Sequence, residues 1–269
     1  MLRRVHIVLP PSEGKSAPTR GRRLDLTGLS FPELADARAR VLTSLIDLCG
    51  GQHRETPVLN QVIQDRAIQT LGLGPTQSGE IERNRRLLTA PTTRADRLYT
   101  GVLYDALSLG TLDTAAKRRA SRRLLVTSSV FGLVRPGDRL PSYRLSGGVT
   151  LPGVGVIAAH WRAHLDPTMR TLIGDGLLVD LRSTTYAAFW RPARDLAEQV
   201  VTVRVLHEQN GKRSVVSHFN KATKGRITRA LLESGETPGT PAEFAELLGD
   251  LGWTVETDGR RIDVIVQEI

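Results

Sequence analysis

The sequence predicts a mixed α/β fold: one domain over residues 1–269, with a mixed sheet flanked by helices. Short apolar runs bounded by Gly and Pro indicate buried strands, and amphipathic stretches between them have helical spacing. Asn210-Gly211 and Asp258-Gly259 each separate two strand-like runs, which is typical of antiparallel hairpins. Strands and helices alternate irregularly, without an internal repeat or linker, so we do not expect a doubly wound repeat.

The first elements surround a loop rich in Gly, Pro and Arg. Residues 5–9 form an apolar run that stops at Pro10-Pro11, which predicts a buried strand. Residues 12–31 are then expected to form either an active loop or an ordered surface segment. A helix is predicted from Pro32 to Cys49, because its leucines share one stripe and two glycines follow it.

The later elements are predicted in the same way. Thr240 and Glu243 form a capping box with Pro at the first helical position, which marks the start of a helix. The other predicted helices are 78–88, 95–109, 112–122, 157–173 and 222–234. The other predicted strands are 124–126, 177–181, 200–207, 214–219, 253–256 and 262–267.

Composition limits the classes of function. Apolar residues make up 40% and charged residues 24%, as in a soluble globular protein. A formal net charge of +9 favours polyanions such as nucleic acid, or an anionic substrate. Only five of the 37 Lys and Arg residues are lysines. A GC-rich genome also raises arginine content, so charge alone leaves the partner open.

The location expected for this chain is the cytoplasm. It has a single cysteine, Cys49, so it can form no internal disulfide, and a reducing compartment is favoured. We interpret Cys49 as a buried structural thiol, with an oxidant sensor as the alternative. No run approaches the roughly 20 apolar residues of a membrane span. The N-terminal apolar run is too short for a signal peptide, so no membrane association is predicted.

A loop that presents arginines to an anion is predicted at residues 128–145. Gly132 and Gly137 allow close approach of the backbone to a ligand, and prolines stiffen the turns. Arg135 and Arg144 supply planar forks of donors that suit phosphate or carboxylate.

A second candidate site follows the first strand. Ser12 and Lys15 come just past its end, where polar residues often form sites in α/β folds. Gly-Lys-Ser at 14–16 is similar to the end of a nucleotide-binding P-loop. Leu9 replaces the first glycine of that motif, and Pro18 blocks the helix that should follow, so we reject it. A solvated turn is the alternative.

Two further segments carry cations or hydroxyls after predicted strands. Lys221, Lys224 and Arg229 fall at a predicted helix start, where cations oppose the helix dipole, so an anion is implied. The alternative is a basic solvated helix. Ser183 and Tyr186 follow the 177–181 strand and can hydrogen-bond phosphate or a base edge, or form an ordinary capped turn.

Two weaker patterns lie close together. His160 and His164 have the i, i+4 spacing of metal ligands, but no third ligand is evident, so no metal site is predicted. Residues 151–155 resemble the hairpin of helix-hairpin-helix DNA binders, whose backbone N–H groups bind phosphate. A simple strand-to-helix turn is the alternative.

Taken in order, these segments resemble the YaaA family, bacterial proteins tied to peroxide stress. The resemblance spans about residues 5–235, and the last 30 residues do not align. Thr184 and Thr185 stand where the family pattern has two acidic residues before Tyr186. The segments that carry it are 11–15, Tyr99 to Tyr104, 129–138, 142–145, Trp161, 181–186 and 221–229.

The resemblance implies a single-domain fold with a positively charged cleft, DNA binding, protection from oxidative damage and a link to lowered intracellular iron. Our leading hypothesis is therefore a cytosolic stress protein that binds double-stranded DNA non-specifically through a basic cleft. We expect the cleft to be formed by Lys15, Arg135, Arg144, Ser183, Lys221, Lys224 and Arg229.

The alternative is an enzyme that acts on a nucleobase, a nucleotide or a similar small anion. Lys15 would serve as general base or imine former, beside Ser12, Tyr143 and Tyr186, with arginines holding the anion. A third option, iron handling by His160 and His164, is weaker. No cofactor is predicted, and the sequence makes no prediction of oligomeric state.

Overall fold

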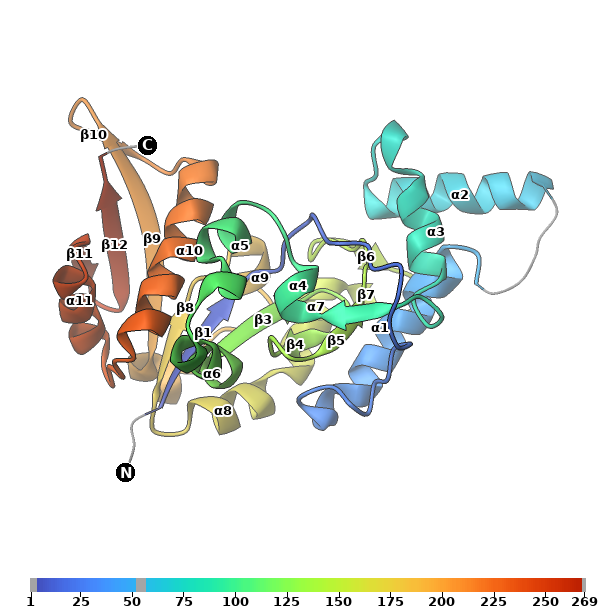
Figure 1. The fold of residues 1–269 in the computed structure, drawn as a ribbon. Helices are drawn as coiled ribbons and strands as arrows, with labels where there is room; N and C mark the ends of the chain where they lie inside the picture. Colours follow the sequence, from blue (N-terminus) through green and yellow to red (C-terminus); the bar gives the residue numbers. More distant parts are fainter. Residues whose placement is uncertain (1–3, 52–56, 268–269) are drawn as a thin grey trace.

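The computed structural model describes residues 4–51 and 57–267 and is organised around one mixed sheet. The strands lie in the order β11-β12-β9-β8-β1-β3-β4, with β10 paired to β9 (Figure 1). The run β12-β9-β8-β1-β3 is parallel, and β4, β10 and β11 are antiparallel additions. The strands are β1 (Val5–Leu9), β3 (Leu124–Ser128), β4 (Gly132–Val134), β8 (Leu177–Asp180), β9 (Val200–Gln209), β10 (Lys212–Ser214), β11 (Thr254–Asp258) and β12 (Arg261–Val266).

Helices cover both faces of this sheet because its central strands are apolar on both sides. In β1, Ile7 packs toward one face and Val8 toward the other. The first face is covered by α5 (Val102–Leu107), α6 (Thr114–Arg123), α10 (Ser217–Ser234) and α11 (Pro241–Asp250) (Figure 1). The second is covered by α1 (Ala35–Leu48), α7 (Ile157–His164) and α8 (Asp166–Ile173), with α2 (Pro57–Leu71) and α3 (Gly79–Arg85) packed on α1.

Short elements complete the chain at the ends of the sheet. Two small antiparallel pairs lie outside the main sheet, β2 with β5 and β6 with β7. The short strands and helices are β2 (Thr92–Arg94), α4 (Ala95–Leu98), β5 (Arg139–Pro141), β6 (Thr150–Leu151), β7 (Gly155–Val156) and α9 (Thr184–Ala187). Single 3-10 turns are η1 (Pro32–Leu34), η2 (Pro75–Gln77), η3 (Leu109–Thr111) and η4 (Arg194–Gln199).

The predicted fold class, a mixed α/β domain with a helix-flanked sheet, is confirmed. β1, β3, β8 and both hairpins occupy the predicted positions. At the predicted start of α11, the Thr240 hydroxyl accepts a hydrogen bond from the Glu243 N–H at 3.1 Å.

The predicted strand at 214–219 is wrong beyond Ser214, since α10 begins at Ser217. Phe219 stacks on His207 of β9 from within that helix, with ring centroids 5.3 Å apart.

Other predicted helices are interrupted for local reasons. The 157–173 helix divides at Leu165, because Pro167 is tolerated in the first turn of α8 but could not continue α7. The 95–109 helix divides at Gly101, whose φ of +93° suits glycine. Residues 151–155 form the turn between the paired strands β6 and β7, so the helix-hairpin-helix interpretation is wrong, and the expected strand-to-helix turn is a strand-to-strand turn that precedes α7. The helix α2 was not predicted.

Two expectations about the chain as a whole can be compared with the structure. Cys49 is buried, and burial raises the pKa of its thiol to about 12, as expected of an inert structural cysteine. Within residues 4–51 and 57–267, no helix has the length and apolar character needed to cross a bilayer.

Candidate active site

The loop that follows β1 is fastened to the connection between α4 and α5. Ser16 N–H donates to the Leu98 carbonyl at 2.8 Å, and Thr100 N–H donates to Ser12 Oγ at 3.1 Å. Lys15 pairs with Tyr99 in an isolated β-bridge between these bonds. Backbone contacts therefore place Lys15 just beyond the carboxyl end of β1, the edge at which ligands bind in parallel sheets.

The Lys15 ammonium is enclosed by backbone and aromatic groups. Its Nζ donates to the Ser12 carbonyl at 2.7 Å and lies 4.2 Å from the centroid of the Tyr143 ring. Burial, with a smaller contribution from the positive charge of Arg144, lowers the pKa of Lys15 to about 7, while Glu80 and Glu13 oppose the shift. Part of this amine is thus unprotonated, and hence nucleophilic, near neutral pH.

A hydrogen-bonded chain of hydroxyl groups lies under the lysine. The Tyr99 and Tyr143 hydroxyls are 3.1 Å apart, and Tyr143 OH is 2.8 Å from Ser128 Oγ. Ser128 Oγ in turn accepts a hydrogen bond from the Phe131 N–H at 3.0 Å. Because Ser128 is the last residue of β3, the chain fixes the Tyr143 ring at the same edge of the sheet as Lys15.

All four tyrosines of the chain gather around this point. Tyr104 stacks on Tyr99 with ring centroids 5.5 Å apart, and its hydroxyl donates to the Pro10 carbonyl at 2.7 Å. Tyr186, from α9, interacts electrostatically with the other three phenols, and burial raises its pKa to about 12. Burial also raises the pKa of Tyr99, Tyr104 and Tyr143. The phenols are thus protonated at neutral pH, and those of Tyr99, Tyr104 and Tyr143 hydrogen-bond within the protein.

Charged groups at the mouth of the site are partly compensated. Arg144 Nη2 lies 3.2 Å from a carboxylate oxygen of Glu13, whose side chain is 80% exposed. Asn84 holds the backbone of Arg144 by accepting from its N–H and donating to its carbonyl, both at 2.8 Å. The backbone of Arg144 is therefore fixed. Its guanidinium lies near Lys15 and can bind an anion while it remains paired with Glu13.

A second lysine with a lowered pKa occupies the same edge of the sheet. Lys224 of α10 is buried, and its Nζ donates to the Arg182 carbonyl at 3.3 Å, just past β8. Burial lowers the pKa of Lys224 to about 8, and Asp180 opposes the shift. Arg182 itself is buried in an ion pair with Asp180 at 2.7 Å. Ser183 follows as the exposed residue before α9.

Three predicted phosphate ligands have other surroundings. Arg135 follows β4, which runs antiparallel to β3, so it lies at the amino edge of the sheet, where its Nη1 donates to the Arg122 carbonyl at 2.7 Å. Arg229 Nη1 is 3.2 Å from the carbonyls of Leu107 and Ser108 at the end of α5. Lys221 is exposed on α10.

The structure therefore brings together Ser12, Lys15, Tyr143, Arg144 and Tyr186, with Lys224 at the same edge. It places Arg135 at the opposite edge. Binding of phosphate by any of these residues stays a prediction.

The two histidines of α7 have backbone partners. His160 is buried with Nε2 3.1 Å from the Ala37 carbonyl, and His164 Nδ1 lies 2.7 Å from the His160 carbonyl. Among the residues that the structure describes, no group of three or more His, Cys, Asp and Glu side chains is placed to hold a metal ion.

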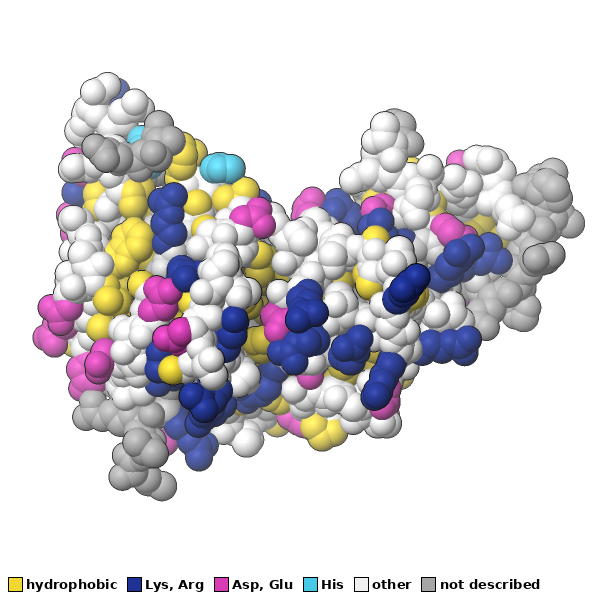
Figure 2. Space-filling view, in the orientation of Figure 1, with side chains coloured by type: hydrophobic (Ala, Val, Ile, Leu, Met, Phe, Trp, Pro, Cys, Tyr) yellow, Lys and Arg dark blue, Asp and Glu magenta, His cyan; other side chains and the backbone are white. Residues whose placement is uncertain are grey.

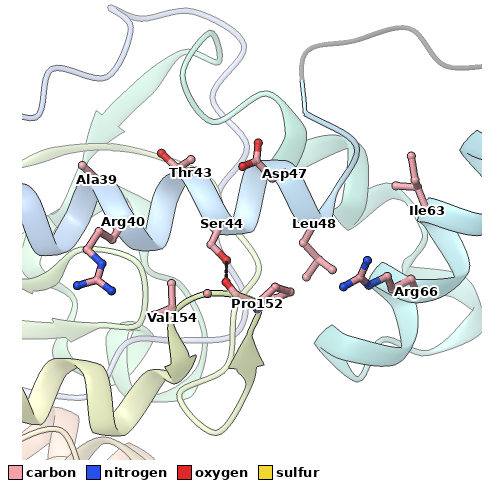
Figure 3. A pocket seen from close by; sticks show the side chains of 11 residues that line it. Ala39, Arg40, Thr43, Ser44, Asp47, Leu48, Ile63, Arg66, Pro152 and Val154 are labelled. Carbon is pink, nitrogen blue, oxygen red and sulfur yellow. Dashed lines mark hydrogen bonds between the residues drawn. The ribbon is translucent and has the colours of Figure 1, made fainter.

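A separate pocket of about 680 Å³ lies between α1, α2 and the β6–β7 turn. Figure 3 shows Arg40 and Arg66 toward its two ends, with Leu48 and Val154 between them. Ser44 Oγ donates to the Pro152 carbonyl at 2.7 Å in its wall. None of the predicted site residues lines this pocket, so it is distinct from the lysine site.

Sequence reasoning did not assign Tyr99, Tyr104 and Ser128 to the site. The sequence did contain a signal for them. The chain has only four tyrosines, and each lies in or beside a segment that the sequence analysis had singled out. The partners of those tyrosines come from separate parts of the chain, however, and only the tertiary fold shows that they meet.

Fold and site together define a single-domain α/β protein with a partly buried lysine and a tyrosine cluster at the carboxyl edge of a mostly parallel sheet. The family model for peroxide stress protein YaaA matches residues 5–258, so the chain belongs to this family. A UPF0246 protein of Streptomyces coelicolor is 50% identical over 270 residues, covering 98% of this chain and 99% of the relative. UPF0246 proteins of Corynebacterium efficiens and Corynebacterium glutamicum are 39% and 36% identical, covering 95% and 93% of this chain and 96% and 94% of the relatives.

Proposed function

We propose that this YaaA-family protein acts in the cytosol by binding double-stranded DNA without sequence specificity, and so limits oxidative damage. The link to lowered iron belongs to the same proposal, as a cellular consequence and not as metal binding by this chain. The observation that carries the proposal is a band of exposed arginines, which we call the arginine belt. It consists of Arg22, Arg23, Arg97, Arg118, Arg122 and Arg139.

Hydrogen bonds connect the segments that carry the belt. The Thr92 N–H donates to the Arg22 carbonyl at 2.8 Å, and Arg139 Nη2 donates to the Thr92 carbonyl at 3.0 Å. Through the bond from Arg135 to the Arg122 carbonyl, the same surface continues onto α6. Figure 2 shows Lys and Arg side chains spread over α6, α4 and the β2–β5 pair on this face.

The belt arginines lack acidic partners, unlike several other surface arginines. Among the described residues, none of the six belt arginines forms an ion pair, whereas Arg94 pairs with Asp96 and Arg213 with Glu256. Uncompensated cations spaced along one face match the repeating charge of a phosphate backbone.

The test is the salt dependence of duplex binding, measured by fluorescence anisotropy with a labelled 20-base-pair duplex of arbitrary sequence. The logarithm of the association constant should fall linearly with the logarithm of salt concentration, and shuffled sequences should bind alike. An affinity that stays constant between low and physiological salt would exclude the proposal.

The Lys15 site favours a second candidate, an enzyme acting on a nucleobase, a nucleotide or a similar small anion. An amine with a pKa near 7, beside buried tyrosines and Arg144, can act as a general base or form an imine with a carbonyl. Ser12 holds the amine through its carbonyl, and Tyr143 holds it through its ring face.

This candidate is tested by competitive labelling with trinitrobenzenesulfonate, with the modified lysines located by peptide mass spectrometry. At pH 7, Lys15 should react faster than Lys117 and Lys212, which are exposed and serve as internal controls. Lys15→Met should bind duplex DNA as the wild type does. Slower labelling of Lys15 than of both controls would eliminate a nucleophilic role.

A further inference from the structure

The pocket of about 680 Å³ between α1, α2 and the β6–β7 turn lies apart from the sites of both proposed functions. Neither the residues gathered around Lys15 nor the belt arginines line it. Pockets that hold small ligands have volumes of roughly 300–1,000 Å³. The size of this pocket therefore suits a small molecule.

The walls of the pocket are held in place by the core. Ser44 Oγ donates to the Pro152 carbonyl at 2.7 Å and so ties α1 to the β6–β7 turn. The wall elements are anchored by Leu45 of α1, Ala67 of α2 and Leu151 of β6, which are buried in one core cluster. The pocket is thus preformed, and a ligand does not have to order its walls on binding.

The middle of the pocket is apolar. Leu48 of α1, Ile63 of α2 and Val154 of the turn line it. In Figure 3 the Leu48 side chain extends from α1 toward Pro152, and Val154 extends from the turn toward α1. This surface favours the aliphatic part of a ligand, because binding removes apolar area from water.

An arginine without a partner lies toward each end of the apolar stretch (Figure 3). Arg40 and Arg66 are exposed, and neither side chain forms a hydrogen bond or an ion pair within residues 4–51 and 57–267. Arg40 precedes Leu48 by about 12 Å along α1 at 1.5 Å per residue, and Figure 3 places the Arg66 guanidinium beyond Leu48. One carboxylate group therefore cannot contact both arginines.

The acidic group of the lining does not cancel these charges. Asp47 is the only acidic member of the lining, against two arginines. In Figure 3 Asp47 and Thr43 extend from the opposite side of α1 to Ser44 and Leu48, so Asp47 does not stand between the arginines. The lining keeps a net positive charge, with a separate donor group at each end.

We propose that this pocket binds an elongated small molecule with an apolar body and a carboxylate at each end, the chemistry of a medium-chain α,ω-dicarboxylate. The apolar body lies against Leu48, Ile63 and Val154. Arg40 and Arg66 each donate N–H groups to one of the two carboxylates, a geometry that suits the guanidinium fork. The inference is independent of DNA binding and of the Lys15 candidate, because it shares no residue with either.

The first test is titration calorimetry at pH 7 and low ionic strength with α,ω-dicarboxylates of six, eight, ten and twelve carbons. Monocarboxylates of the same lengths serve as paired probes. Affinity should pass through a maximum at one length, where the dicarboxylate binds at least about five-fold more tightly than the monocarboxylate. Equal affinity of the two at every length, or no binding of any dicarboxylate, would overturn the proposal.

The second test removes one arginine at a time. Arg40→Gln and Arg66→Gln should each weaken binding of the best dicarboxylate by at least about five-fold and lower its advantage over the monocarboxylate to at most about two-fold. Arg191→Gln is the matched control, since it removes the same charge at an exposed position outside the pocket. Equal weakening in the control would assign the binding to net charge alone and contradict the proposal.

The third test fills the apolar middle while keeping both arginines. Val154→Trp should abolish binding of dicarboxylates and monocarboxylates alike, and its melting temperature shows whether the variant is folded. Unchanged binding by folded Val154→Trp would place the ligand outside the pocket and refute the proposal. If Val154→Trp does not fold, the two arginine variants still decide the matter, because both substitutions are at exposed positions.

Discussion

At the scale of single residues, arginine and lysine have different uses in this molecule. Arg38 is completely buried and donates to four backbone carbonyls, those of Phe131, Leu133, Ser30 and Phe31. Arg135 and Arg229 likewise donate to carbonyls. Sequence alone cannot separate such structural arginines from ligand-binding ones, because both carry the same side chain and the distinction depends on neighbours brought by the fold.

Lys15 should make the stability of the protein depend on pH in the alkaline range. Its pKa is lowered to about 7 in the folded state, so the unfolded chain binds more protons between pH 7 and 10.5. The free energy of unfolding should therefore rise with pH across this window, by at most about 1.4 kcal/mol per pH unit before solvent screening reduces it.

Urea unfolding at pH 7, 8 and 9 measures this slope. The Lys15→Met variant has no amine at this position, so the Lys15 contribution to the slope should disappear. Lys224, whose pKa is lowered to about 8, should still produce a smaller rise of the unfolding free energy with pH in both proteins. Parallel curves for wild type and Lys15→Met would show that Lys15 titrates normally.

At the scale of elements, local signals predicted most strands and the capped helix. The β1 run, the Asp258-Gly259 turn and the Thr240 cap depend on neighbouring residues only, and all three are present. The beginning of α10 was misplaced because Val215 to Phe219 is apolar enough for a strand. The segment is helical instead, and from α10 the Phe219 ring packs on His207 of β9. Where α2 packs depends on α1, which no local pattern reveals.

Gly225 should be essential for the packing of α10 on α5. A Cβ added at this buried position would lie 2.2 Å from the Leu103 carbonyl oxygen, a backbone atom that cannot yield without moving α5. Gly225→Ala should therefore destabilise the protein by about 1–3 kcal/mol, despite the higher helix propensity of alanine. Chemical denaturation measures this difference.

Gly249→Ala in α11 is the matched control. A Cβ there meets nothing within 4 Å, so the substitution should be neutral or stabilising by up to about 1 kcal/mol. Loss of stability equal to that of Gly225→Ala would refute the close-approach argument.

At the scale of the whole molecule, topology decides which distant residues meet. The parallel pairing of β1 with β3 and β8 brings their carboxyl ends to one edge, and with them Lys15, Tyr143 and Tyr186. This meeting could be anticipated from strand ends. The antiparallel return of β4 could not, and it carries Arg135 to the other edge. Cations were thus predictable in number, but not in their grouping into a belt and a site.

Placement of charge, beyond net charge, should govern the binding of DNA. Replacing Arg23, Arg97 and Arg118 with glutamine removes three belt cations that form no side-chain hydrogen bond with the described residues, so the fold should persist. Each lost phosphate contact should reduce the salt slope by about 0.9, and the triple variant should lose about two to three units of slope.

A charge-matched variant separates the two explanations. Replacing Arg66, Arg191 and Lys212 with glutamine lowers the net charge by the same amount, at exposed positions outside the belt. Long-range attraction alone would weaken DNA binding equally in both variants, because it depends on total charge. A belt in contact with phosphates requires the first variant to lose at least about ten-fold more affinity than the second. Equal losses in anisotropy titrations at the same salt concentration would show that the belt is not the interface.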